Sequence, residues 1–341
     1  NAGDDGGNIW NATKVNGTNI CGGSWLGGNY WSDYAGMDLT ADGLGDTLVP
    51  YTAGGAIATG GDYLPLTPVS SGTVHNLDSG ENFTTIRDAI CSHNTVNGTT
   101  IVVDPGIYTE NLEVNKSVTI RATSGDPADT IVRAVNASLH VFAIRANNVN
   151  ISGFTIENAT AAAGIYLANV EGCAISNNNA MENDYGIYLD RAEHISLAGN
   201  TLTGNRYNIR IDGDTLSHFN QTVDTSNLVN NRPIYYLRDE RDQRIPADAG
   251  FVGLVNCTNI TVSTATLTKN YEGVLVLWSA GITLENLSVS ENYRGIYLRN
   301  SSTCTLSNNI AKNNEYGVYL DRAEHISLAG NTLTGNRYNI R

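Results

Sequence analysis

The chain has 341 residues, of which 20 are Lys or Arg and 34 are Asp or Glu, so its formal net charge is −14. Such an acidic surface excludes nucleic acid and anionic membranes as preferred partners, because their phosphates would repel it. No stretch has the pattern of a signal peptide or a membrane span, so no membrane insertion is expected in this segment.

Residues 1–50 are rich in Gly, Asn and Trp, and they contain Trp10, Trp25 and Trp31. Leaving so many indole rings in water is unfavourable, so this segment is predicted to be a compact cap or strap. A flexible linker is the alternative, and the aromatic residues argue against it.

A possible calcium loop follows within the same segment. Asp38, Thr40 and Asp42 place side-chain oxygens at alternate positions, Leu44 offers a backbone carbonyl, and Asp46 adds a carboxylate. Val49 stands where such loops carry a bidentate Glu, so an Asx turn closed by glycines is the alternative. The spacing of the oxygen ligands makes calcium the expected cofactor.

Residues 51–75 contain repeated Gly and Pro and are predicted to be a linker. Residues 76–130 are predicted to hold a short amphipathic helix and the first coils of a repeat structure. The helix is indicated by apolar residues at helical spacing, namely Phe83, Ile86, Ala89 and Ile90. We expect this helix to plug the open first coil, since solenoids need terminal caps.

Over most of residues 131–341 the sequence repeats with a period of 22 residues. Short alternating strands open at Gly164, Gly186 and Asn208, and again at Gly273, Gly295, Gly317 and Asn339. A second apolar strand follows in each repeat. Asn recurs at one phase in Asn183, Asn205, Asn292, Asn314 and Asn336, and at another in Asn178, Asn200, Asn309 and Asn331.

A repeat of this length, with two or three short strands, cannot bury its own apolar face. Stacking one coil on the next buries it, with parallel pairing between coils. Asn suits left-handed corners and can also bond along the stack. The sequence therefore predicts an all-β, right-handed parallel β-helix. A leucine-rich repeat fold is disfavoured, because the Leu spacing and the helical half-repeat of that fold are absent from this sequence.

Two features interrupt or duplicate this pattern. Residues 212–250 have no 22-residue phase and are predicted to be a lateral insertion. Residues 185–210 return at 316–341 with one change, Ile187 to Val318. A chain ending inside such a strand would leave an unpaired edge, so we expect the protein to join copies of itself, end to end or laterally.

Thirteen Asn-X-Ser/Thr sequons are compatible with a secreted glycoprotein. Asn150 and Asn259 lie inside expected strands and are predicted to point inward and stay bare. Cys173 and Cys304 share one strand position and are predicted to face the core. The candidate glycosylation sites are Asn11, Asn16, Asn82, Asn97, Asn115, Asn136, Asn158, Asn220, Asn256, Asn286 and Asn300.

Several stretches resemble known families. The run FTTIRDAICSHNTVNGTTIVVDPGIYTENLEV is similar to the cap and first coil of β-helix proteins such as pectinesterases. The GIYL coils and RPIYYLRDERDQRIPADAGFVGLVNCTNITV resemble NosD-like repeats of carbohydrate-binding and sugar-hydrolase type. GGNYWSDYAGMDLTADGLGDT resembles a segment of archaeal surface proteins, with Thr40 where Asp is usual. The resemblance implies a β-helix on an archaeal cell surface.

Catalysis is not expected. Asp190, Arg191, Glu193 and His194 cluster on one coil, but Asp321, Arg322, Glu324 and His325 repeat the cluster unchanged. An enzyme rarely needs its active site twice, whereas structural corner residues would be copied in this way. Copper delivery is also disfavoured, because the chain has two Met and scattered His.

The sequence thus predicts an extracellular, glycosylated structural protein, a rigid unit of a surface layer, sheath or filament. The alternative is a module that binds or cleaves polysaccharide, with surface glycans as possible partners. Exposed aromatic residues along a groove, with unduplicated acids, would favour the alternative.

Overall fold

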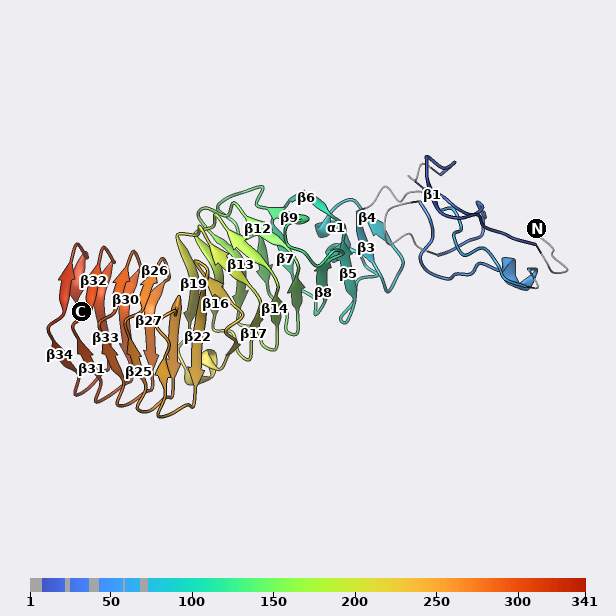
Figure 1. The fold of residues 1–341 in the computed structure, drawn as a ribbon. Coiled ribbons are helices and arrows are strands. Elements are labelled where there is room, and N and C mark those ends of the chain that lie inside the picture. The colour runs from blue at the N-terminus through green and yellow to red at the C-terminus, as the bar shows by residue number, and fades with distance from the viewer. Residues whose placement is uncertain (1–7, 22–24, 37–42, 58, 68–72) are drawn as a thin grey trace. The chain divides into compact units, whose positions relative to one another are not determined.

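The computed structural model describes residues 8–21, 25–36, 43–57, 59–67 and 73–341. The chain forms two compact units, one of Asn1–His75 with Gly80–Thr84 and one of Asn76–Ser79 with Thr85–Arg341 (Figure 1). None of the helices within these described ranges is long and apolar enough to cross a membrane.

The first unit is organised by a buried carboxylate. Asp62 has no exposed surface and accepts hydrogen bonds from the backbone N–H of Asn29 (2.7 Å) and Leu64 (3.0 Å) and from Trp31 Nε1 (2.9 Å). The Trp31 ring lies 5.7 Å from that of Trp10 and 4.9 Å from that of Tyr51. This unit also contains β1 (Val15–Asn16), β2 (Trp25–Leu26), η1 (Ala53–Gly55), β4 (Asn82–Phe83) and the first two residues of β3 (Val74–Asn76), which pairs with β4.

The prediction that residues 51–75 form a linker is corrected by the structure. Tyr51 forms an antiparallel bridge with Asp62, and Leu66 bridges to Leu44, so the described residues 51–57 and 59–67 belong to the first unit. The Gly and Pro residues of these two ranges are thus part of a folded segment. The reason is that Asp62, Tyr51 and Leu66 carry the buried contacts that a linker would lack.

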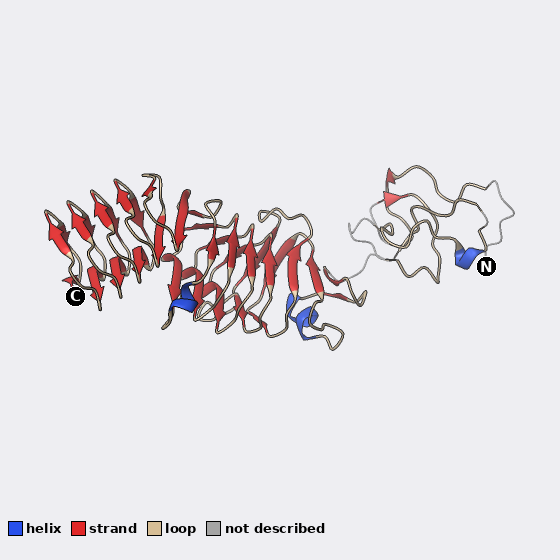
Figure 2. Ribbon diagram, turned by 90° about the horizontal axis from the view of Figure 1, so that it is seen from below, coloured by secondary structure: helices blue, strands red, loops and turns tan. Residues whose placement is uncertain are grey.

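The second unit is a right-handed parallel β-helix of about eleven coils, as predicted. Its earlier coils each contribute one strand to three parallel sheets (Figures 1 and 2). The first sheet holds β5 (Thr100–Val103), β8 (Thr119–Ala122), β11 (Asn150–Ser152), β14 (Ala174–Ser176), β17 (Ser196–Ala198) and β20 (Thr222–Val223). The second holds β6 (Gly106–Thr109), β9 (Thr130–Arg133), β12 (Thr155–Glu157), β15 (Asn179–Met181), β18 (Thr201–Thr203) and β21 (Leu228–Val229). The third holds β7 (Leu112–Val114), β10 (Phe142–Ile144), β13 (Ala163–Ala168), β16 (Tyr185–Asp190) and β19 (Tyr207–Asp212).

We call these coils the first stack and the remaining coils the second stack. The second stack repeats the three-strand coil. Its first series is β23 (Arg244–Ile245), β25 (Thr261–Ser263), β28 (Thr283–Glu285), β31 (Thr305–Ser307) and β34 (Ser327–Ala329). Its second series is β26 (Thr266–Thr268), β29 (Ser288–Ser290), β32 (Ile310–Lys312) and β35 (Thr332–Thr334). Its third series is β22 (Arg232–Arg238), β24 (Phe251–Val255), β27 (Glu272–Leu277), β30 (Arg294–Arg299), β33 (Tyr316–Asp321) and β36 (Tyr338–Ile340).

Strand alternation places the core. Ile165 and Leu167 of β13 are fully buried and pair with Ile187 and Leu189 of β16, while Tyr166 between them faces out. Cys173 and Cys304 are each 1% exposed, as expected for core residues. All five cysteines are free.

The recurring Asn residues form buried ladders. Asn200 Oδ1 accepts from the backbone N–H of Asn178 (3.1 Å), and Asn200 Nδ2 donates to Asn227 Oδ1 (2.9 Å). The expected left-handed corners fall elsewhere: Asn177, with φ 53°, precedes the ladder residue Asn178. The preceding residue takes the strained turn, which directs the ladder side chain inward.

The expected amphipathic helix is α1 (Ile86–Cys91), with Ile86, Ala89 and Ile90 buried. Thr85 caps it by accepting from Asp88 N (3.0 Å), and the helix contacts β5 and β7. Its role as a plug for the first coil is not supported.

Residues 212–250 are not a lateral insertion, which corrects the sequence-based prediction. Their strands β20 and β21 pair with β17 and β18 inside the stack. The chain then reverses through Asn230 and Asn231, both left-handed (φ 49° and 63°), into antiparallel β22. Two left-handed residues are what a two-residue hairpin needs.

Candidate functional site

The outer face of the third sheet carries a row of polar and aromatic side chains. Parallel register places Tyr166 beside Tyr188, and Tyr188 beside Arg210. The rings of Tyr166 and Tyr188 are 5.0 Å apart, and the Arg210 guanidinium lies 4.3 Å from the Tyr188 ring. The alternation that buries Ile165 and Leu167 therefore also builds this row.

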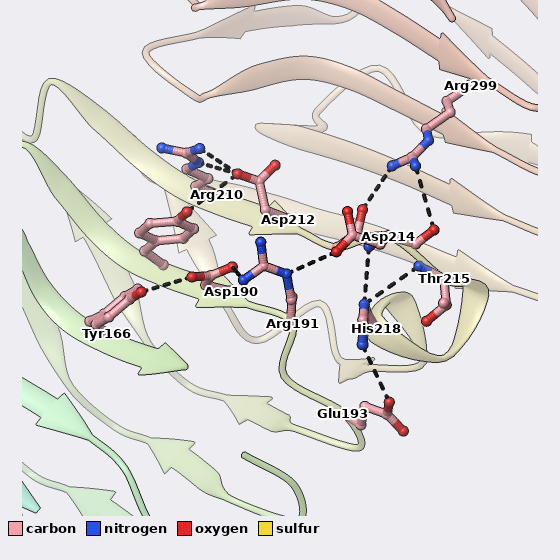
Figure 3. A network of polar contacts seen from close by, with 12 residues as sticks. Tyr166, Asp190, Arg191, Glu193, Arg210, Asp212, Asp214, Thr215, His218 and Arg299 are labelled. Carbon is pink, nitrogen blue, oxygen red and sulfur yellow. Dashed lines mark hydrogen bonds and ion pairs between the residues drawn. The ribbon is translucent and has the colours of Figure 1, made fainter. Parts of the chain in front are cut away.

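Carboxylates stand at the ends of the same strands. Asp190 and Asp212 are register partners, and Figure 3 shows both in one polar network. Tyr166 donates to Asp190 Oδ2 (2.8 Å), and Arg210 Nε donates to Asp212 Oδ2 (2.7 Å). Both acids thus have a donor supplied by a side chain of the outer row.

The corner after these strands extends the network through η2 (Leu216–Phe219) (Figure 3). Arg191 Nε lies 2.9 Å from Asp214 Oδ2, and this hydrogen bond lowers the pKa of Asp214. His218 Nδ1 accepts from Asp214 N (3.0 Å), so the ring proton is on Nε2, which lies 3.6 Å from Glu193 Oε1. Ser217 also donates to Glu193 (2.9 Å).

This arrangement is better suited to a structural role than to general acid–base catalysis. Glycoside hydrolysis needs one carboxyl that is protonated near neutral pH and a second with free access to the sugar. The lowered pKa keeps Asp214 ionised, and His218 Nδ1 is occupied by the backbone. The network therefore ties the corner of one coil to η2.

The duplicated cluster has different surroundings. Asp321, the counterpart of Asp190, lies 3.4 Å from Tyr297 Oη and 3.4 Å from Arg299 Nε. Asn220 Nδ2 lies 2.9 Å from His194 Nε2 in the first copy. The two copies thus share residue types at one corner, while the partners come from whichever segment lies beside it.

Where the two stacks meet, a second polar cluster forms that the sequence did not reveal. We call this junction the seam. Asn208 N donates to Lys269 O (2.7 Å), and Tyr271 N donates to Ile209 O (3.1 Å). The Arg210 guanidinium lies 3.9 Å from the Tyr271 ring, opposite its contact with Tyr188.

Next to it, Glu272 is buried, with 1% of its side chain exposed, and Arg294 Nη1 lies 2.6 Å from Glu272 Oε1. Burial raises the pKa of Glu272 to about 7. The sequence offers one sign of this pair: Glu272 and Arg294 occupy the repeat position that is Tyr185 and Tyr316 in other coils. A charged pair in an aromatic column points to a special contact.

The expected calcium loop is mostly outside the described residues, since Asp38, Thr40 and Asp42 are not among them. Of the other two, Leu44 is buried and Asp46 is exposed. No group of three or more His, Cys, Asp or Glu able to hold a metal occurs within the part of the chain that the structure describes.

Most candidate glycosylation sites are exposed, while Asn11, Asn220 and Asn300 are half-buried. Asn150 and Asn259 were predicted to point inward, and this was wrong. Both are exposed: Asn150 Nδ2 donates to Thr119 Oγ1 (3.1 Å) and Asn259, with φ 56°, donates to Asp242 Oδ1 (2.7 Å). Asn150 alternates with buried Ile151, and Asn259 lies at a corner.

A family model described as periplasmic copper-binding protein (NosD) matches residues 1–36, 92–232 and 239–341. A cell surface glycoprotein of Methanothermus fervidus is 43% identical over 105 residues. That match covers 31% of this chain and 17% of the glycoprotein, so the chain spans only a small part of its relative's length.

Among solved structures, the A-module of Azotobacter vinelandii mannuronan C-5 epimerase AlgE4 matches with a TM-score of 0.38 and 13% identity over 75% of this chain and 91% of that one. Alginate lyase from a Paenibacillus strain gives 0.40 and 12%, over 74% and 93%. Pectate lyase Pel9A gives 0.39 and 12%, over 77% and 74%. These likenesses are too distant to bear on activity.

The donor set does not fit the copper binding named in that family description. Copper sites use clustered His, Cys or Met. The chain has two Met and six His, and Cys173, Cys257 and Cys304 are buried in the core. In the described residues His and Cys do not gather into a cluster of three, even when Asp and Glu are counted with them.

Proposed function

The chain belongs to the NosD family, and we propose that it is a structural protein of the cell surface, a rigid β-helix unit of a layer, sheath or filament. The observation that carries this proposal is the 105-residue match, at 43% identity, to a protein named cell surface glycoprotein. The exposed sequons are compatible with the same location.

The architecture supports a load-bearing role. Successive coils of the first stack are joined by parallel ladders, three between most of them, and the later coils are also joined by side-chain bonds between buried Asn residues. A solenoid in which each coil binds its neighbours resists bending, because deforming it breaks bonds in several sheets at once. Rigidity of this kind suits a spacer or wall element.

The proposal assigns no catalytic residue. Asp190→Ala and His194→Ala should leave no enzymatic phenotype, because their contacts are those of a coil corner. Purified protein would be incubated with acidic and neutral polysaccharides, and product length measured by chromatography. Depolymerisation that both substitutions abolish would contradict the proposal.

The partners proposed are copies of the same chain, joined end to end or side by side. Electron microscopy of native cell envelopes, with antibody labelling of this protein, is the test. Rods or sheets with a recurring axial spacing would support the scaffold role. Labelled particles that stay isolated at high concentration, with calcium present, would contradict it.

Calcium binding at residues 38–46 stays a prediction. Calorimetric titration should show calcium-dependent heat that is lost in Asp42→Ala, because Asp42 would supply a ligand. Asp78→Ala, which removes an exposed acid outside the loop, is the control. Equal heats for the three proteins would overturn the assignment.

Binding of surface glycans is the second candidate function. The outward row of Tyr166, Tyr188 and Arg210 favours it, because aromatic faces and arginine are common in sugar-binding surfaces. The row is half-buried, so the site must lie where this face opens.

A further inference from the structure

The outer face of the third sheet opens into a hollow of about 450 Å³ beside α1, β7 and β10. Its cause can be read from one register column: Glu113, Ala143, Tyr166 and Tyr188 occupy equivalent outward positions on successive coils. Two coils fill this position with a Tyr ring, and Ala143 fills it with a methyl group. The missing ring leaves the hollow.

One wall is an aromatic plate. The His140 ring stacks on Tyr166 at 4.2 Å with an interplanar angle of 22°. His140 Nδ1 accepts from Ala163 N (3.0 Å), which leaves the ring proton on Nε2. Burial, together with the nearby Arg145 charge, lowers the pKa of His140, so the ring is neutral at neutral pH. Leu139, which is 53% exposed, adds an apolar edge.

Two guanidinium groups border the hollow. Arg87 extends from α1, and its Nη2 donates to Asn111 O (2.7 Å), which fixes the group in place. Arg145 follows β10 and lies 5.0 Å from the Tyr166 ring. The one acid in the lining is Glu113 of β7. In a chain of net charge −14, this recess has two cations and one anion.

We propose that this hollow binds a carboxylated sugar, a hexuronate residue that is either free or part of a polysaccharide. Arginine forks pair with carboxylates in bidentate geometry, and Arg87 and Arg145 supply two forks. The His140–Tyr166 plate offers a face for sugar C–H groups, and Glu113 can accept from hydroxyls. The volume is within the range of small-ligand sites. This names a site and ligand for the second candidate function, and the scaffold role does not depend on it.

Calorimetry and NMR titration of the full chain test the proposal, with glucuronate, galacturonate and their short oligomers as ligands. Glucose and inorganic phosphate are the comparison ligands. Uronates should bind, oligomers more tightly than monomers if a polymer is the natural ligand. Arg145→Gln should weaken uronate binding about tenfold or more, the cost of losing a charge-assisted hydrogen bond.

Ala143→Tyr is the sharper variant, because it installs the side chain that the next two coils already carry. It should fold with an unchanged melting temperature and lose uronate binding. Arg337→Gln removes an exposed arginine paired with Glu315 in the second stack and should bind like the unmodified chain. If Ala143→Tyr misfolds, the double variant Arg87→Gln with Arg145→Gln is tested instead. It should lose uronate binding, and retained binding would contradict the proposal.

Four outcomes would overturn the inference. The unmodified chain shows no uronate binding, or Ala143→Tyr folds and still binds. Inorganic phosphate binds as tightly as uronate, which would make the hollow an unselective anion site. Glucose binds as tightly as uronate, which would make the arginines irrelevant. None of these results would affect the electron-microscopy test of the scaffold role.

Discussion

At the scale of single residues, buried amides hold the coils together. Asn200 is fully buried and satisfies four groups: it accepts from the N–H and Nδ2 of Asn178 and donates to Ile175 O (2.7 Å) and Asn227 Oδ1. Leaving such groups unpaired costs more than the bond itself contributes, because water cannot replace the partner.

Asn200→Ala should therefore lower the free energy of unfolding by about 2–4 kcal/mol, since at least one buried N–H and one buried C=O lose their partner. Chemical denaturation with circular dichroism measures it. Asn147→Ala is the matched control: Asn147 Oδ1 also accepts a backbone N–H, from Glu171 (3.0 Å), but in an exposed site. It should cost less than about 1.5 kcal/mol, and equal losses would contradict the ladder's role.

The Asn columns could be predicted from sequence because a fixed phase in a solenoid places equal residues above one another. Their backbone geometry could not. Left-handed corners fall on Asn177 and Glu182, one residue before ladder residues Asn178 and Asn183. Pattern alone does not say which member of a neighbouring pair turns the chain and which points inward.

At the scale of elements, the seam joins the third sheet of the first stack to the second stack. It contains Arg210 between Tyr188 and Tyr271, and the buried pair Glu272 and Arg294. Glu272 Oε2 and Arg294 Nε are buried with no protein hydrogen-bond partner. A buried pair with unsatisfied atoms is costly to keep charged.

The seam should respond to pH. The pKa of Glu272 is raised from 4.5 to about 7 in the fold, so between these values the folded chain binds a proton that the unfolded chain releases. Stability should therefore fall as pH rises from 4.5 to 7, by at most on the order of 3 kcal/mol. Melting temperatures across pH 5–8 test this.

Glu272→Gln should flatten that slope whatever it does to overall stability. Glu285→Gln removes a half-buried acid of the same stack, near Arg244, and should keep the slope of the unmodified chain. An unchanged slope in Glu272→Gln would show that another group controls the pH dependence.

Neither the seam nor the hollow beside α1 could be predicted from sequence. The 22-residue phase stops before residue 212, and no local signal states that β22 will reverse direction and continue the sheet of β21 into the second stack. Arg210 meets Tyr271 through that reversal alone. The hollow needs the coil register, which aligns Ala143 with Tyr166 although the spacing there is not 22 residues.

At the scale of the whole molecule, stability is a sum of neighbouring contacts, so weak interfaces open first. Apart from the β21–β22 hairpin, the seam has two backbone hydrogen bonds, both between β19 and residues 269–271, whereas coils within a stack pair along whole strands. The parallel β-helix itself could be predicted, because period, alternation and Asn phase agree on it.

Hydrogen exchange should therefore be faster at the amides of Asn208 and Tyr271 than at those of Ser196 and Thr283, which bond within stacks. Mass spectrometry of peptides that contain these amides measures the difference. Equal protection at all four would show that the two stacks open as one cooperative unit.

The hairpin at Asn230 and Asn231 also changes which way the molecule faces. One twelve-stranded sheet runs through both stacks, but it is the second strand of each coil before the hairpin and the third strand after it. The strands also reverse direction there, and the core changes face. Val229 of the first-stack core lies on the sheet face of Ile234 and Tyr236, whereas Tyr235 and Leu237 on the other face pack into the core of the second stack. The face of this sheet that points outward in the first stack therefore covers the core of the second.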